Sequence, residues 1–166
     1  GKQGTSVVAL TTTVIPTTVA ASILFNGEPA SGKSYIVTSA GMFTDVSAGA
    51  AAYMQAFVET SILPLTTAPA TADTGPIRGL VAGKVYGGKA AISKTVTVTD
   101  NGWVPVGKAV ETALTATIGR CPGGILDEPI IVPPGFYVAL AVNATNATVS
   151  GKCFFYWHEV QLDLGS

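Results

Sequence analysis

The segment PIIVPPGFYVALAV, residues 129–142, says most about the fold. Two runs rich in β-branched, aliphatic and aromatic residues lie on either side of Pro133-Pro134-Gly135. Such residues suit the pleated surface of a β-sheet, whereas two prolines and a glycine form a rigid turn. The segment therefore predicts two strands joined by a sharp turn.

The same pattern recurs along the chain, because short β-rich runs alternate with clusters of Gly, Pro, Asn and Asp. No segment keeps a 3.6-residue apolar period over three turns, so helices are not expected. Short strands separated by turn residues are typical of an antiparallel sandwich or barrel. The dipeptide Asn101-Gly102 predicts a tight hairpin between its flanking strands, because both residues accept positive φ. The further strands are predicted at 21–26, 34–39, 53–60, 77–86, 92–99, 102–106, 111–118 and 152–162.

The first part of the chain is almost free of charge. Residues 5–20, TSVVALTTTVIPTTVA, are small or β-branched, and Pro16 interrupts them. Since proline cannot donate to a central strand, the sequence predicts an edge strand or an extended arm over residues 1–20. The longest loop, 61–76, shows no change of composition, so we expect residues 1–166 to form a single domain.

The composition excludes several classes of protein. Hydrophobic residues make up 48% and charged residues 11%, with a net charge of −1. Soluble domains carry roughly 25% charged residues. These values do not fit a disordered chain or a basic nucleic-acid-binding surface. They also do not fit a membrane-spanning helix or a basic membrane anchor. The first residues do not have the pattern of a signal peptide. The surface is therefore either an uncharged Thr/Ser-rich coat or is covered by other subunits. Depletion of charge favours the second interpretation.

One motif points to nucleotide chemistry. Residues 27–34, GEPASGKS, match the phosphate-loop pattern, with Asp100 as a candidate metal-holding partner. That loop works through backbone amides at the start of a helix, but Ser34 is followed by the strand-like YIVTS. We therefore interpret the match as a glycine-rich hairpin loop. A nucleotide hydrolase using Lys33 and Ser34 remains the enzyme alternative.

Other catalytic and metal-binding residues are scarce. The chain has one histidine, His158, and no G-x-S-x-G nucleophile motif. Two cysteines, Cys121 and Cys153, are too few for a disulfide framework, and we expect free thiols. The sequence predicts no enzyme, no catalytic residue, no metal site and no cofactor.

The most aromatic segment is 152–162, KCFFYWHEVQL. Successive side chains of a strand point to opposite faces, so its rings divide between the core and a second face that also needs cover. A neighbouring subunit would supply that cover. The residues predicted to lie at subunit contacts are Phe155, Trp157 and His158 of this strand and Val14 and Ile15 of the arm.

Four short segments carry a resemblance to a known group of proteins: LFNG at 24–27 with SYIV at 34–37, GWVPV at 102–106, IVPPG at 131–135 and YWHEV at 156–160. They resemble jelly-roll proteins of tailed-bacteriophage particles, which are similar in fold to the trimeric heads of the tumour-necrosis-factor and C1q class. The resemblance implies a virion structural protein at the particle surface, with no catalytic residue.

We therefore expect an all-β protein, an antiparallel jelly-roll β-sandwich of about 8–10 short strands with little or no helix. The expected function is that of a capsid decoration (cement) subunit, a homo-oligomer and by resemblance a trimer, in contact with the major capsid protein or other virion proteins. Nucleic acid and membrane are not expected partners. The alternative is a receptor-binding head domain of a phage fibre or spike.

Overall fold

The computed structural model describes residues 2–3, 8–9, 11–12, 18–28, 32–46, 52–65, 77, 86–112, 121–145 and 150–162. All regular structure within these ranges is β-strand, which confirms the all-β prediction. The strands are β1 (Lys2–Gln3), β2 (Val8–Ala9), β3 (Thr11–Thr12), β4 (Val19–Asn26), β5 (Lys33–Val46), β6 (Ala52–Thr60), β7 (Ala90–Thr97), β8 (Val104–Thr112), β9 (Gly123–Val132), β10 (Tyr137–Ala144) and β11 (Ser150–Gln161).

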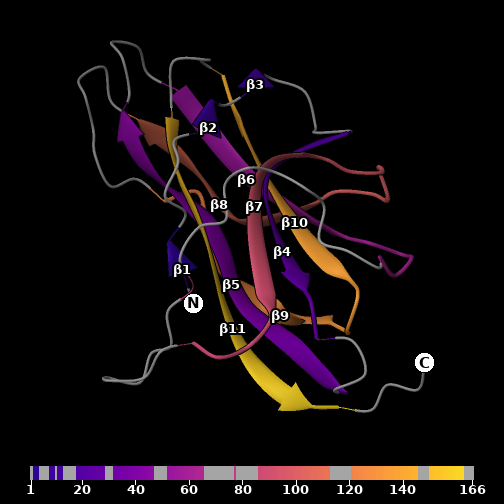
Figure 1. Ribbon diagram of the computed structural model, residues 1–166. Helices are drawn as coiled ribbons and strands as arrows, with labels where there is room; N and C mark the ends of the chain where they lie inside the picture. The colour runs from indigo at the N-terminus through magenta and orange to yellow at the C-terminus, as the bar shows by residue number, and fades with distance from the viewer. Residues whose placement is uncertain are drawn as a thin grey trace.

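The strands form one curled antiparallel sheet that folds into two layers (Figure 1). The first layer has the order β11-β5-β9, and β1 and β2 pair with the outer edge of β11. The second layer has the order β8-β6-β10-β4-β7. The two-residue strand β3 pairs with β10 in parallel. Of the described residues among 1–20, β1 and β2 add to the edge strand β11, whereas β3 pairs with the interior strand β10 and residues 19–20 belong to β4.

The two layers join where β8 meets β9, through the pair Lys108 and Gly123. Gly107 has a φ of 65°, and a side chain there would come within 2.5 Å of the carbonyl oxygen of Gly123. Glycine is therefore required on both counts. β8 extends past this point to Thr112, whereas separate strands were predicted at 102–106 and 111–118. Residues 113–118 of the second one lie outside the described residues, as does most of 77–86.

Two hairpin predictions were wrong, because in each case the next strand along the chain is not the neighbour in the sheet. The segments on either side of Gly27 and Gly32 are strands, but β4 pairs with β10 and β7 whereas β5 pairs with β11 and β9. The connection between them crosses from one layer to the other. Pro133-Pro134-Gly135 makes a similar crossing between β9 and β10, so its two predicted strands are confirmed without being partners. Chain turns are visible in a sequence, but the layer that receives the next strand is not.

The second wrong hairpin is at Asn101-Gly102. β7 and β8 lie at opposite edges of the second layer, so the segment between them spans that layer instead of turning back. Gly102 does take a positive φ of 100°, and its N–H donates to the side chain of Asp100 at 3.0 Å. The N–H of Asn101 donates to Glu59. The turn residues are used locally, without a hairpin.

The main hydrophobic core lies between the layers. Its largest fully buried side chains include Tyr35, Met42, Met54, Leu140 and Phe155. A second cluster covers the opposite face of β4 and β10 and includes Ile23, Phe25, Tyr137 and Val96, with Trp103 packed against it. β4 and β10 are therefore buried on both faces. This double burial explains why their sequences are continuous apolar runs without alternation.

Candidate functional site

The outer face of β11, β5 and β9 is the candidate site for protein contacts. The strand register places His158, Ile36 and Ile131 side by side in one row. The neighbouring residues Tyr35 and Val37 are fully buried in the core, so the row between them points outward. We call this surface the outer face and define it by Ile36, Ile125, Ile131, Tyr156 and His158.

The outer face carries exposed large apolar side chains. Ile125 is 83% exposed, Ile131 47% and Tyr156 40%. The ring of Tyr156 lies 5.4 Å from that of Phe154, which in turn lies 4.9 Å from the ring of Phe43. In the register Ser39 lies between Tyr156 and Ile125, and Ile36 lies between His158 and Ile131, so the face is mixed in polarity. Large apolar side chains exposed on one face are a feature of interaction surfaces.

The five residues predicted at subunit contacts fall into three groups. Phe155 is completely buried in the main core, so its side chain has no surface for a partner. Trp157 also faces inward, with its ring 6.0 Å from Tyr35 and 6.2 Å from Tyr86. His158 is exposed on the outer face. Val14 and Ile15 lie outside the described residues.

Strand alternation explains why Phe155 and Trp157 face inward and not toward a partner, as was predicted. Along β11, Cys153 and Phe155 lie in the core and Trp157 packs against it, while Tyr156 and His158 face outward. The prediction that rings divide between two faces therefore holds, but two of the three chosen residues belong to the inner set. The isoleucines of the outer face come from β5 and β9, and only the pairing of these strands with β11 reveals them.

The phosphate-loop match has no helix behind it. β5 begins at Lys33 and continues through Val46, which confirms the strand predicted after Ser34. The Asn26 amide donates to the carbonyl oxygens of Lys33 at 2.8 Å and Val132 at 2.9 Å. Ser34 is fully buried. Asn26 thus ties the start of β5 to the end of β9, and residues 29–31 of the motif lie outside the described residues.

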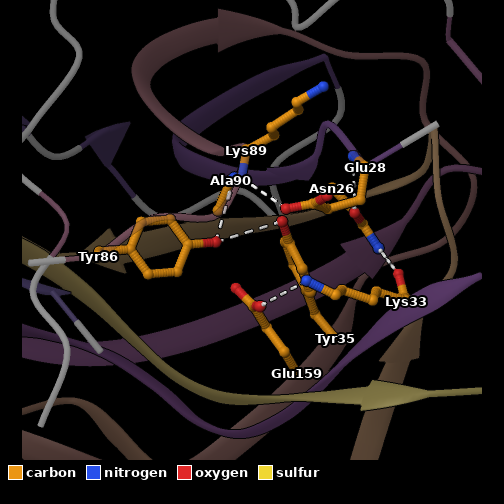
Figure 2. A network of polar contacts seen from close by, with 8 residues as sticks. All are labelled: Asn26, Glu28, Lys33, Tyr35, Tyr86, Lys89, Ala90 and Glu159. Carbon is orange, nitrogen blue, oxygen red and sulfur yellow. Dashed lines mark hydrogen bonds and ion pairs between the residues drawn. The ribbon is translucent and has the colours of Figure 1, made fainter. Parts of the chain in front are cut away.

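A polar network closes this end of the molecule (Figure 2). Buried Glu28 accepts the N–H of Lys89 at 2.6 Å, which fixes the β4–β5 connection to the start of β7. The Tyr86 hydroxyl accepts the N–H of Ala90 at 3.2 Å and lies 3.4 Å from the Tyr35 hydroxyl. The Lys33 ammonium lies 4.0 Å from the Glu159 carboxylate.

Electrostatics keep the two tyrosines of the network neutral. Burial, followed by hydrogen bonding to Glu159, raises the pKa of Tyr86 to about 12. Burial and the contact with Tyr86 raise the pKa of Tyr35 still further. A phenol that holds its proton this tightly is a poor nucleophile, so the two tyrosines serve this network as neutral hydrogen-bonding groups.

A pocket that the sequence did not predict lies between β8 and β9. It has a volume of about 360 Å³, and its lining includes three acidic residues, Glu59, Asp127 and Glu128. Glu59 is buried, with 3% of its surface exposed. A carboxylate at the end of β6 gives no sign of burial in the sequence, because burial arises when the segment after β7 folds over it.

Both cysteines are free, and Cys153 is buried. Within the described ranges, no three His, Cys, Asp or Glu side chains gather in a way that could hold a metal ion. The described residues also include no helix of the length and apolarity needed to cross a membrane.

Comparison with protein-family models, with curated proteins and with solved structures finds no match to this chain.

Proposed function

We propose that this chain is a structural subunit of a virus particle, a capsid decoration protein that works as a homo-oligomer through its outer face. The observation that carries the proposal is the row of exposed His158, half-buried Ile36 and exposed Ile131, in a chain with only 11% charged residues. Obligate interfaces are depleted of charge and resemble a core cut in two.

The order of the strands supports the jelly-roll form of this proposal. The order β11-β5-β9 faces β8-β6-β10-β4, and the chain changes layer between β4 and β5 and between β9 and β10. A sandwich wound in this way leaves one broad sheet face for neighbours. The location in a virion and the trimeric state are proposed from the resemblance of residues 131–135 and 156–160 to phage jelly-roll proteins.

The function is mechanical and needs no reacting group. Apolar surface removed from water stabilises a contact by about 25 cal/mol per Å² before the costs of association. A subunit that spans the joints between capsid proteins adds such contacts across each joint. We therefore place the protein at the particle surface, without a cofactor.

The test is binding to particles. Labelled protein is mixed with tailed-phage capsids from the same source that have been stripped of their decoration protein, and the particles are sedimented. We expect saturation at a fixed number of copies per particle, together with capsids that withstand higher temperature. Binding to host cells in place of capsids would support the receptor-binding head domain, and binding to neither would refute a virion role.

A further inference from the structure

The segment between β7 and β8, residues 98–103, crosses the second layer, and we call it the strap. Val98 at its first end is a buried member of the second cluster, and Trp103 at its other end packs against that cluster. Between them, the backbone of Thr99 is hydrogen-bonded to the hydroxyl of Tyr137. The strap therefore covers part of the face of the second layer that points away from the main core.

Glu59 of β6 lies under the strap, with 3% of its surface exposed. Its neighbour Val58 faces the main core, so Glu59 points to the opposite side, where it is paired with Ala139 of the second cluster. The N–H of Asn101 donates to Oε2 of Glu59 at 3.2 Å. The side-chain amide of Asn101 donates to the carbonyl oxygen of Thr60 at 3.3 Å. These two bonds fix the middle of the strap to β6.

The carboxylate of Glu59 is incompletely hydrogen-bonded in this position. Oε1 of Glu59 and Nε1 of Trp103 are both buried, and neither has a hydrogen-bond partner among the described residues. β6 and β8 pair at Val58 and Val104, and the same register continued by one residue places Glu59 opposite Trp103. A buried carboxylate with one donor has lost water that the protein does not replace, which favours the neutral form of the side chain.

The surroundings of Glu59 disfavour its charged form. Burial raises the pKa of Glu59, the N–H of Asn101 opposes this effect, and the negative charge of Asp100 on the strap adds to it. The other titratable group that faces Glu59 is Tyr137 of β10, whose own pKa is raised by burial and by the charge of Glu59. Neither neighbour is a cation. The closed strap therefore holds a proton on Glu59 more tightly than an open strap would.

We propose that Glu59 makes the strap a pH-dependent cover, which is closed over the second cluster while Glu59 is protonated and loosens when Glu59 ionises. As the pH rises, the proton passes to solvent, and water stabilises the remaining carboxylate better than the closed strap does. Loosening uncovers Tyr137, which the closed strap keeps at 5% exposure. The apolar surface open to a partner thus grows as the pH rises. The inference does not depend on the proposed function.

Amide hydrogen exchange of the full chain, followed by NMR from about pH 4 to about pH 7, tests the proposal. The equilibrium constant for opening at the Asn101 N–H is obtained after correction for the intrinsic exchange rate at each pH. Between the pKa values of Glu59 in the open and closed forms, this constant should rise by up to about tenfold per pH unit and then level off. The indole N–H of Trp103 should follow it. The N–H of Leu140, in the centre of β10, should not.

Three variants separate the effect of Glu59 from other effects of pH. Glu59→Gln removes the charge and keeps a side-chain oxygen for the Asn101 N–H, so the strap should stay closed at neutral pH with no dependence on pH. Glu128→Gln makes the same change at an exposed residue of β9 and should behave as the natural chain does. Asp100 is exposed, so Asp100→Asn should fold, and it should move the rise to lower pH because a negative charge near Glu59 is removed.

Three results would overturn the proposal. The first is an opening constant at Asn101 that does not change with pH in the natural chain. The second is a rise that persists unchanged in Glu59→Gln or, if that variant does not fold, a rise that Asp100→Asn leaves at the same pH. The third is an equal rise at the Leu140 N–H, because the whole domain and not the strap would then be opening.

Discussion

Neighbouring residues of β11 should respond to truncation in opposite ways. Phe155 is fully buried between the layers, whereas Tyr156, one position along, is 40% exposed on the outer face. Replacing a buried phenylalanine by alanine removes its burial and leaves a cavity, which costs about 3–5 kcal/mol. The total stability of a domain is about 5–15 kcal/mol, so Phe155→Ala should be severely destabilised. Phe155→Leu provides a milder variant that should still fold.

Tyr156→Ala should have little effect on folding. Its main intramolecular partner is the ring of Phe154 at 5.4 Å, and such a pair is worth about 0.5–1.5 kcal/mol. Its effect on self-association should be larger, because truncating a central interface tyrosine often costs 2 kcal/mol or more, roughly thirtyfold in affinity.

Urea unfolding at one low protein concentration measures the first effect, since association stabilises by mass action. Sedimentation velocity across a concentration series measures the second. Equal losses of unfolding free energy in Phe155→Ala and Tyr156→Ala would refute the assignment of the two side chains to opposite faces. A loss below about 1 kcal/mol in Phe155→Ala would refute its place in the core.

Three further predictions follow from burial and charge. A thiol reagent should modify Cys121 in the native protein but Cys153 only after unfolding. Only 4% of Cys153 is exposed, and burial raises the pKa of its thiol to about 12. Rapid labelling of both cysteines in the native protein would contradict the structure. Because the pKa of Tyr86 is raised, the folded state holds the phenolic proton more tightly than the unfolded state does. The free energy of unfolding, followed through the urea midpoint, should therefore fall as the pH rises from about 10 to about 12. Tyr86→Phe should make this dependence on pH less steep. Lys33→Ala should lower the free energy of unfolding by less than about 1 kcal/mol, because the Lys33 side chain is half-exposed and its ammonium lies 4.0 Å from Glu159. Titration with ATP should show no binding to the natural chain or to the variant. Saturable binding to the natural chain that is lost in the variant would establish a nucleotide site.

Local patterns in the sequence were enough to predict much of the fold. The apolar runs at 21–26 and 137–142, the turn at Pro133-Pro134-Gly135 and the strand after Ser34 all appear in the structure. These features depend on the conformational preferences of a few adjacent residues, so they are visible without knowledge of strand pairing.

The pairing of the strands could not be predicted from the sequence. The expected hairpins around Gly27 and Asn101 require that successive strands be neighbours, but in a two-layer fold the next strand can join the other layer or the far edge. The isoleucines of the outer face were not predicted for a related reason. Ile36 and Ile131 meet His158 only through the register of three strands that are distant in sequence. An extra residue in β5, Thr38, also shifts the alternation of that strand, so a simple period-two pattern fails there.

Equilibrium sedimentation of the natural chain at micromolar concentration tests the central claim most directly, alongside Ile131→Lys and the matched control Val19→Lys. Ile131 is 47% exposed on the outer face, and Val19 is 49% exposed on β4 in the other layer. We predict a homo-oligomer, a trimer, for the natural chain and for Val19→Lys, and a folded monomer for Ile131→Lys. A natural chain that sediments as a well-folded monomer, or an Ile131→Lys variant that associates as the natural chain does, would contradict the account.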